Sequence, residues 1–325
     1  MNDPAPSLGF DIGGQSIKAA LVSPDAEVLA HASLRTGEGT TAESLVDALL
    51  SLRETLSRDV ALPPRGMGIG VAGVLDRSGA LRGSPHLPLL VGCRVAEIVS
   101  ARLATQVVVH NDADCAAVAE GWGGAANGCE DFLMIAIGTG VGSGLVLGAR
   151  LRAGASGFGC EFGHMMVVHE GRRCGCGNRG CLEAYISETA ARGLVEEASA
   201  PLRAKVAARR ANEGGGFAQA VFEFGSAGDA EAESIAGRMV DVLGAAIGSA
   251  VNVLDLTTIV LGGGIAPGVL ARLERLRCAA GGNLFARPAG DLVIGLDQIS
   301  NAMGQGGIAA TTIRNDLAKE RPLLR

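Results

Sequence analysis

Three glycine-rich turns, each placed directly after a short apolar run, constrain the fold of this chain more than any other feature. The turns contain Gly13 and Gly14, then Gly138, Thr139 and Gly140, and finally Gly262, Gly263 and Gly264. A short apolar run that ends in glycine is typical of a buried strand followed by a turn. Because glycine has no Cβ atom, such a turn lets backbone N–H groups approach a phosphate closely. A single such turn is more often purely structural, but three of them favour phosphate binding.

Strand and helix patterns alternate along the chain, which predicts an α/β protein. The predicted strands cover residues 8–12, 17–22, 28–34, 66–74, 107–110, 132–137, 141–147 and 257–261. The predicted helices cover residues 40–59, 113–122, 182–210, 231–254 and about 268–278. The first two strands are expected to form a hairpin with Asp11 near its tip. Several strands thus precede the first helix, unlike the start of a Rossmann domain.

Composition narrows the class of protein. A length of 325 residues is sufficient for about two domains with a sizeable core. Hydrophobic residues make up 48% and charged residues 19%, which excludes a disordered chain. A net charge of −6, with 8 Phe, one Tyr and one Trp, argues against a nucleic-acid partner. Because we find neither a long apolar span nor a signal-peptide pattern, we expect a cytoplasmic protein with no membrane partner.

Two common nucleotide-binding motifs do not account for the glycine turns. Residues 68–73 match the G-x-G-x-x-G pattern of dinucleotide-binding domains, but a strand and a turn follow instead of the required helix. The Walker A pattern is absent because none of Lys18, Lys205 and Lys319 follows a glycine. A carboxylate such as Asp11 can instead hold Mg²⁺ through water, because this ion dehydrates reluctantly.

A cysteine cluster is the most specific local signal in the sequence. Cys174, Cys176 and Cys181 lie within eight residues, separated mainly by glycines, and His164 precedes them. Three thiolates and one imidazole complete a tetrahedral zinc site with no open position, which is typical of structural zinc. A redox-active cluster and a chance spacing are the alternatives. We expect structural zinc.

Acidic residues follow the strand predicted at residues 107–110 and flank the cysteine cluster. Asp112 or Asp114 is compatible with a helix N-terminal cap. A carboxylate there can also take a proton from a substrate hydroxyl while Asn111 holds a neighbouring hydroxyl. Glu161 and Glu183 lie on either side of the cluster, so a bound zinc would direct both toward one cavity. Glu183 also suits the first turn of a helix, where the helix dipole favours a negative charge.

Together these motifs resemble those of the ROK family, which comprises repressors, uncharacterised open reading frames and sugar kinases. The resemblance covers nearly the whole chain. The matching segments are residues 11–14 for the first phosphate motif, 138–140 for the second, 261–264 for the adenosine-side turn, and 161–165 with 174–183 for the family signature and zinc knuckle. The order of the motifs and the knuckle make this resemblance specific.

The resemblance implies an actin-like ATPase fold of the ribonuclease H-like type, with two α/β lobes around an active-site cleft. The small N-terminal lobe would comprise residues 1–112 with about 300–325, and the large lobe residues 113–299 with the zinc knuckle. The implied partner is a small-molecule sugar, and the implied cofactors are ATP, Mg²⁺ and structural Zn²⁺. Homodimers are common in the family, so we expect a homodimer.

The resemblance also implies a role for individual residues. Asp112 would be the general base that deprotonates the 6-hydroxyl of a hexose or N-acylhexosamine. Residues that would bind the sugar are Gly73, His86, Asn111, Asp112, Glu161, His164 and Glu183. Residues that would bind ATP and Mg²⁺ are Asp11, Gly13, Gly14, Gln15, Lys18, Gly138, Thr139, Gly140, Gly262, Gly263 and Gly264. Residues that would bind zinc are His164, Cys174, Cys176 and Cys181.

Four positions depart from the family pattern. Gln15 stands where kinases of the family usually have Thr, and Ala72 stands where Pro is common. Asp114 replaces a frequent Asn, and His86 occupies a place usually given to a sugar-contacting Asn. The changes at Gln15 and His86 bear on the geometry of the phosphoryl donor and on the identity of the sugar.

Three other functions compete with that of an ATP-dependent sugar kinase. A catalytically inactive sugar-binding sensor or regulator of the same fold is compatible with Gln15, but it would not need Asp112. A DNA-binding repressor would carry a helix-turn-helix region before the first phosphate motif, and only ten residues precede Asp11. A polyphosphate-dependent kinase would generally lack the full cysteine knuckle. We therefore predict an ATP-dependent sugar kinase.

Overall fold

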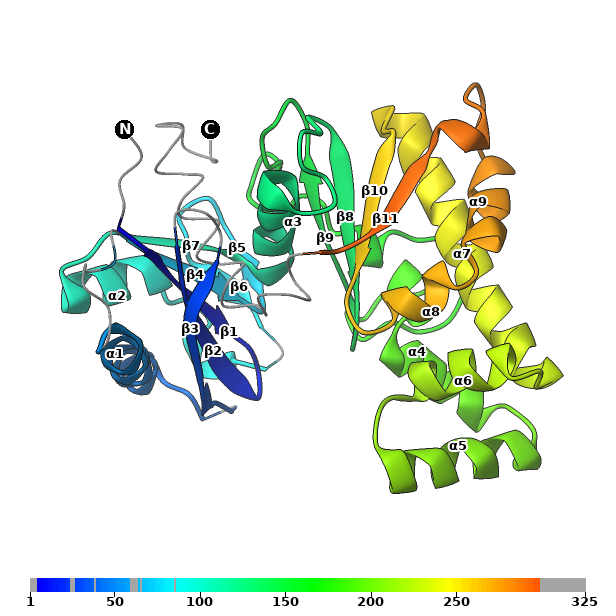
Figure 1. Ribbon diagram of the computed structural model, residues 1–325, viewed down its shortest axis with the longest axis horizontal. Helices are drawn as coiled ribbons and strands as arrows, with labels where there is room; N and C mark the ends of the chain where they lie inside the picture. The colour runs from blue at the N-terminus through cyan, green and yellow to red at the C-terminus, as the bar shows by residue number, and fades with distance from the viewer. Residues whose placement is uncertain are drawn as a thin grey trace. The chain divides into compact units, whose positions relative to one another are not determined.

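The computed structural model describes residues 5–23, 27–37, 39–58, 64, 66–84 and 86–298 (Figure 1). Its internal contacts separate two units. The first unit contains the described parts of Met1–Glu130, Gly144–Cys160 and Asp297–Arg325, and the second contains Asp131–Ser143 and Glu161–Leu296. The predicted assignment of residues 300–325 to the small lobe lies outside the described residues.

A five-stranded sheet forms the centre of the first unit. Its strand order is β3-β2-β1-β4-β7, with bounds β1 Ser7–Ile12, β2 Ser16–Val22, β3 Val28–Arg35, β4 Met67–Val71 and β7 Val107–Asn111. The first three strands are antiparallel neighbours, whereas β1, β4 and β7 run parallel. The hairpin predicted at the start of the chain is therefore confirmed. The parallel strands carry their carboxyl ends to one edge of the sheet.

Helices complete the core of the first unit. Their bounds are α1 Ala42–Ser57, α2 Val95–Leu103 and α3 Asp112–Gly123, with a short 3₁₀ turn η1 Pro88–Leu90. Helix α1 begins where the sequence predicted, because Thr41 and Ser44 cap each other's backbone N–H groups. Its buried stripe, which includes Leu45, Leu49 and Leu52, packs into the same core as the inner face of β1.

Residues 74–83 form a small hairpin rather than a helix. Strand β4 ends at Val71, and β5 Val74–Leu75 pairs antiparallel with β6 Leu81–Gly83. Asp76 stabilises the turn by accepting hydrogen bonds from Ser78 N–H and Ala80 N–H and by pairing with Arg82. This hairpin confirms that the G-x-G-x-x-G pattern at residues 68–73 does not open a dinucleotide-binding helix.

The second unit contains a four-stranded sheet in the order β11-β10-β8-β9. The strand bounds are β8 Phe132–Ile137, β9 Val141–Val146, β10 Thr258–Gly262 and β11 Val293–Leu296. Strands β8, β10 and β11 are parallel. The division between the two units falls within β9, between Ser143 and Gly144.

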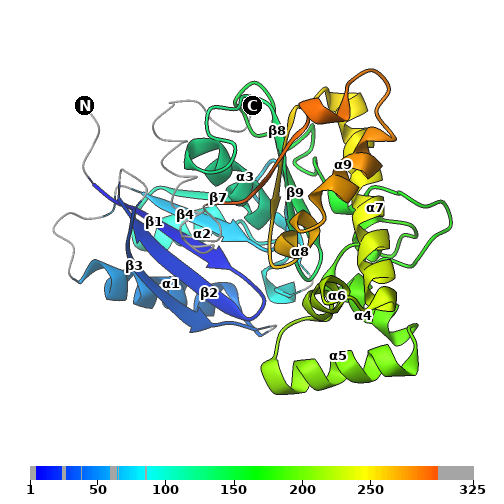
Figure 2. The same cartoon turned by 45° about the vertical axis from the view of Figure 1, so that its right-hand side comes forward.

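Helices make up most of the remaining second unit. They are α4 Glu188–Glu196, α5 Ala200–Glu213, α6 Phe217–Ser226, α7 Ala230–Leu254, α8 Ala266–Leu270 and α9 Leu273–Gly281, with 3₁₀ turns η2 Phe162–His164, η3 Leu182–Ala184 and η4 Ala289–Asp291. Helices α7 and α9 lie side by side (Figures 1 and 2). Helix α7 is long and apolar enough to cross a membrane by composition alone, but 67% of its most apolar window is buried, as in the core helix of a folded domain.

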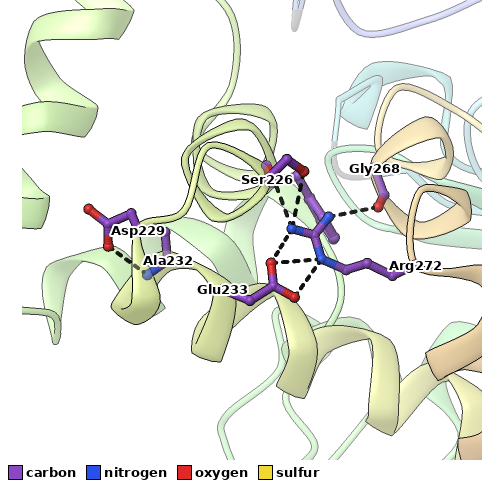
Figure 3. A network of polar contacts seen from close by, with 7 residues as sticks. Ser226, Asp229, Ala232, Glu233, Gly268 and Arg272 are labelled. Atoms are coloured by element: carbon purple, nitrogen blue, oxygen red, sulfur yellow. Dashed lines mark hydrogen bonds and ion pairs between the residues drawn. The ribbon is translucent and has the colours of Figure 1, made fainter.

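A buried arginine joins three of these helices. Arg272, just before α9, pairs with Glu233 of α7 and donates to the Gly268 carbonyl of α8 at 3.2 Å (Figure 3). It also donates to the Phe222 carbonyl and the Ser226 hydroxyl of α6. The Arg272 side chain is only 8% exposed, so it is a structural link inside the helical layer.

The prediction of one helical stretch over residues 182–210 is wrong. The structure has η3, α4 and α5 there, and serines restart the helices: Ser187 Oγ accepts from Ala190 N–H and Ser199 Oγ from Leu202 N–H. The sequence patterns also did not predict α2, α6 or β11, and they merged α8 with α9. Helix α6 follows the glycine-rich break directly, and its N-terminus is capped from a distance by Glu188, which accepts from Phe217 N–H and Ala218 N–H.

Candidate active site and metal cluster

The parallel strands of the first unit bring distant predicted site residues to one sheet edge. Ile12 pairs in register with Val71, and Val71 with Asn111, so the residues that follow these strands are neighbours. The Asn111 amide donates to the Gly73 carbonyl at 2.8 Å, and its Oδ1 accepts from Ala113 N–H at 2.8 Å. Asn111 is therefore the N-cap of α3, which leaves Asp112 as the first helical residue. The predicted cap at Asp112 or Asp114 is wrong.

Asp11 is a buried carboxyl close to a second one. Only 3% of the residue is exposed. Burial, and then the negative charge of Asp112, raise the pKa of Asp11 to about 7, while Lys18 opposes the shift. Lys18 is the register partner of Asp11 on β2. A cation beside Asp11 would relieve this unfavourable charge, so the carboxyl fits a position next to Mg²⁺.

The first glycine turn packs against His86. A Cβ atom at position 14 would overlap the Cβ and ring of His86, so glycine is required for this close approach. The sequence did not predict the contribution of Thr36, whose hydroxyl donates to the Gly13 carbonyl at 2.8 Å and whose N–H donates to the Gln15 carbonyl at 3.1 Å. The Gln15 side chain itself is exposed.

The second and third glycine turns are adjacent in the second unit. They follow β8 and β10, which are parallel neighbours with Gly262 opposite Ala136. The Ile265 N–H donates to the Ile137 carbonyl at 3.2 Å. Gly263 has a φ of +83°, and a Cβ atom there would lie 2.5 Å from the Ile137 carbonyl oxygen. The two turns predicted to bind phosphate and adenosine thus lie together.

Helix α4 stabilises the second glycine turn through two hydrogen bonds. The Glu188 N–H donates to the Gly138 carbonyl at 2.9 Å, and the Thr189 hydroxyl donates to the Thr139 carbonyl at 3.1 Å. Within the turn, Gly138 N–H donates to the Gly140 carbonyl at 2.9 Å. No local pattern predicts the roles of Glu188 and Thr189, because about fifty residues separate them from the turn.

The four predicted metal ligands form one cluster. Their ligand atoms all lie within 4.8 Å of one another. Cys174 Sγ is 3.7 Å from His164 Nδ1, and Cys176 Sγ is 3.7 Å from Cys181 Sγ. Tetrahedral zinc with Zn–S bonds of about 2.3 Å places its sulfur ligands about 3.8 Å apart, so this donor set fits a zinc ion. The sulfur separation is far longer than the roughly 2 Å of a disulfide.

Two acidic residues lie beside the cluster. Glu161 directly precedes η2, and its pKa is raised above the usual value. Burial is the main cause, His164 opposes the shift, and the negative charge of Glu183 adds to it. Glu183 lies in the first turn of η3, a 3₁₀ turn of three residues, and not in the long helix that the sequence predicted. Glu183 Oε2 accepts from Val141 N–H at 3.0 Å, and Glu183 Oε1 accepts from the Cys174 thiol at 3.3 Å.

The predicted site residues therefore form two groups. The first-unit group is Asp11, Gly13, Gly14, Gln15, Lys18, Gly73, His86, Asn111 and Asp112. The second-unit group is Gly138, Thr139, Gly140, Glu161, His164, Cys174, Cys176, Cys181, Glu183, Gly262, Gly263 and Gly264. Each group is assembled from segments that lie far apart in the sequence.

Solved structures define the class of the fold. The chain aligns with a ROK family glucokinase from Streptomyces griseus in complex with glucose and AMPPNP, with a TM-score of 0.77 and 29% identity over 98% of this chain and 100% of that one. A ROK family transcriptional regulator, homologous to E. coli MLC, aligns with a TM-score of 0.83 and 23% identity over 97% of this chain and 79% of that one, which bears on the fold alone. The chain has the actin-like ATPase fold of these proteins.

The ROK family profile matches residues 7–309, and the chain belongs to this family. It is 31% identical to the glucokinase of Streptomyces coelicolor over 97% of this chain and 98% of that protein. It is 30% identical to the N-acetylmannosamine kinase of Escherichia fergusonii over 82% of this chain and 87% of that protein. These relatives identify the chain as a sugar kinase.

Proposed function

We propose that this protein transfers the γ-phosphoryl group of ATP to the 6-hydroxyl of a hexose or N-acylhexosamine, with Asp112 as the general base. The observation that carries the proposal is the position of Asp112 at the N-terminus of α3, beside the buried Asp11 and directly after the N-cap Asn111. A carboxylate that begins a helix is stabilised in its charged form by the helix dipole. It is then able to accept the hydroxyl proton as the oxygen attacks phosphorus.

The first-unit group would supply the charged chemistry. In this proposal Asp112 takes the proton, and Asn111, Gly73 and His86 orient the sugar hydroxyls. Asp11 would hold Mg²⁺ through its water ligands, and that ion supplies charge neutralisation on the phosphates when it is bound. The elevated pKa of Asp11 supports a cation-dependent role, because its carboxylate form is unfavourable without a positive neighbour.

The second-unit group would bind the phosphates and adenosine of ATP and some of the sugar hydroxyls. Backbone N–H groups at residues 138–140 would bind phosphate oxygens, and residues 262–264 would lie on the adenosine side. Glu161, His164 and Glu183 would accept or donate hydrogen bonds to sugar hydroxyls. We assign the cysteine cluster to structural zinc, which orders η2 and η3 and leaves no open position for catalysis.

The relatives include a glucokinase and an N-acetylmannosamine kinase, which supports either glucose or an N-acetylated amino sugar as the substrate. We propose that His86 helps to discriminate between these sugars, because it packs on the first glycine turn and departs from the family pattern. We further propose a cytoplasmic homodimer that acts on a small-molecule sugar without a nucleic-acid or membrane partner. The second candidate is a sugar-binding sensor without catalysis, which Gln15 in the phosphate loop would favour.

A coupled ADP-release assay tests the proposal. Purified protein with Mg²⁺–ATP is offered glucose, mannose, fructose, allose, N-acetylglucosamine and N-acetylmannosamine, with Asp112→Asn as the matched blank. We expect turnover with one class of sugar that disappears in Asp112→Asn. Absence of turnover across the panel, in protein that still binds a sugar by calorimetry, would contradict the kinase and favour the sensor.

A further inference from the structure

Glu183 connects the metal cluster to the second glycine turn. Its Oε2 accepts from Val141 N–H at 3.0 Å, directly after the turn at residues 138–140. Its Oε1 lies 3.3 Å from the sulfur of Cys174, one of the four clustered ligands. One carboxylate therefore contacts both a metal-ligating residue and the first backbone N–H beyond the turn.

The turn is shaped to receive this carboxylate. A Cβ atom at position 140 would overlap Glu183 Oε2, so the carboxylate reaches Val141 only because residue 140 is glycine. The packing of Glu183 therefore requires glycine at position 140, in addition to any contact of Gly140 with phosphate. This close packing makes the conformation of the turn depend on the position of Glu183.

The metal ligands in turn determine where Glu183 lies. Cys181 is the N-cap of η3, the short 3₁₀ turn that bears Glu183. The Leu182 N–H donates to the Met165 carbonyl at 3.0 Å, which ties η3 to the residue after His164. The Phe162 N–H donates to Ser143 Oγ at 3.1 Å, so η2 is also fixed to β9. The two 3₁₀ turns are thus tied to each other through Met165 and to β9 through Ser143 and Glu183.

We propose that Glu183 is a positioning residue that transmits metal occupancy to the phosphate-binding turn, so that metal-loaded protein binds nucleotide more tightly than metal-free protein. This inference rests on the proposed function, in which residues 138–140 bind phosphate. Glu183 would then have two roles: the contact with the sugar in the proposed function, and an indirect effect on the binding of ATP. The coupling runs through the backbone, from Cys181 into η3 and Glu183, and not through the thiol hydrogen bond, because a metal-bound Cys174 would no longer donate to Oε1.

The expected effect is moderate. The turn keeps two anchors from α4, the Glu188 N–H on Gly138 and the Thr189 hydroxyl on Thr139. It should therefore remain folded without metal but lose its fixed orientation at Val141. We expect nucleotide affinity to fall about tenfold, since one partly buried hydrogen bond from Val141 N–H to a charged group is lost.

Hydrogen exchange tests the link between metal and turn without reliance on activity. Peptides that cover residues 138–143 are compared in zinc-loaded and chelator-stripped full-length protein, and in Glu183→Ala. We expect exchange at the Val141 N–H to accelerate about tenfold or more on stripping, and stripping to add nothing further in Glu183→Ala. Unchanged protection of this peptide in stripped wild-type protein would overturn the inference.

Calorimetry with Mg²⁺–ADP in the absence of sugar provides the second test. Glu183→Ala should weaken ADP binding about tenfold, whereas Glu183→Gln should restore most of it, because the amide oxygen still accepts from Val141. Glu161→Ala, the matched carboxylate on the other side of the cluster, should leave ADP affinity within about twofold. Equal ADP affinity in wild type and Glu183→Ala would overturn the inference.

The two proposals fail in different ways. If the sugar panel shows no turnover while ADP binding follows the metal and Glu183, the proposed function fails and the coupling stands. If sugar phosphorylation proceeds while ADP affinity and exchange at the Val141 N–H are the same with and without metal, the coupling fails and the proposed function stands.

Discussion

The first-unit group and the second-unit group are built by different means. In the first, carboxylates from β1 and from the end of β7 approach through the register of a parallel sheet. In the second, glycine turns expose backbone, and four ligands close together fix two short 3₁₀ turns. The comparison indicates that strand register brings the carboxylates of the first group together, whereas the second group depends on close packing at glycines and on its clustered ligands.

The two groups also differ in what they need from a bound cation. The pKa of Asp11 rises to about 7 because the residue is buried and faces Asp112. A cation there would change the charge of a reacting centre. At the cysteine cluster, a metal would act on shape, because its ligands support Glu183 and through it the glycine turn. The following predictions separate these two kinds of dependence.

The largest effect should come from removing the base in the first-unit group. Asp112→Asn keeps the size of the side chain but cannot accept the hydroxyl proton, so kcat should fall about 10²–10⁴-fold. The dissociation constant for the sugar should change by less than about threefold. Asp114→Asn, two residues along the same helix, is the matched control and should keep kcat within a few fold. Equal losses in both variants would remove Asp112 from the mechanism.

A smaller effect, on stability, should come from Asp11. Its pKa is raised from 3.8 to about 7 in the folded protein, so the folded state binds the proton more tightly than the unfolded chain. The free energy of unfolding should therefore decrease as pH rises from about 4 to about 7. Asp11→Asn should remove this dependence and stabilise the Mg²⁺-free protein above pH 7 by up to about 4 kcal/mol, with no difference below pH 4.

Urea unfolding across this pH range measures the Asp11 effect. Asp76 is a control of opposite sign, because hydrogen bonds from Ser78 and Arg82 hold its pKa well below the usual range. Asp76→Asn should destabilise the protein at neutral pH, and this difference should disappear in acid. A wild-type stability that stays level between pH 4 and 7 would contradict the buried-charge account of Asp11.

The smallest effect concerns the helical frame of the second unit. Arg272 is nearly buried and links Glu233 to carbonyls of α6 and α8 (Figure 3). Arg272→Ala should lower the free energy of unfolding by about 2 kcal/mol, because it leaves buried carbonyls without this donor.

The matched control for Arg272 is a nearby exposed ion pair. Arg275 pairs with Asp241, and both side chains are 45% exposed. Arg275→Ala should therefore change the free energy of unfolding by less than about 1 kcal/mol. Equal losses in chemical denaturation of the two variants would show that burial of Arg272 adds nothing.

The sequence predicted those parts of the site whose signals are local. The first hairpin was predicted from the two short apolar runs on either side of Gly13 and Gly14, and the metal cluster from the spacing of Cys174, Cys176 and Cys181. The strands β8 and β10 were predicted because each is a continuous apolar run before glycine. In each case the deciding residues lie within a few positions of one another.

The contacts that the sequence did not predict join residues that are far apart. Thr36 supports Gly13 across 23 residues, and Thr189 supports Thr139 across 50. The sequence offered Asp112 or Asp114 as the cap of α3, but Asn111 takes this position: its Oδ1 accepts from Ala113 N–H, and its amide donates to the Gly73 carbonyl 38 residues away. Similarly, β11 is a strand because it pairs with β10, although its four residues carry little pattern of their own.

The central claim, phosphoryl transfer to the 6-hydroxyl of a sugar, is tested most directly by phosphorus and proton NMR of the reaction product. The sugar with the highest turnover is compared with its 6-deoxy analogue under the same conditions. The account predicts a phosphomonoester at carbon 6 and no sugar phosphate from the analogue. A phosphate at another carbon, or phosphorylation of the 6-deoxy sugar, would contradict it.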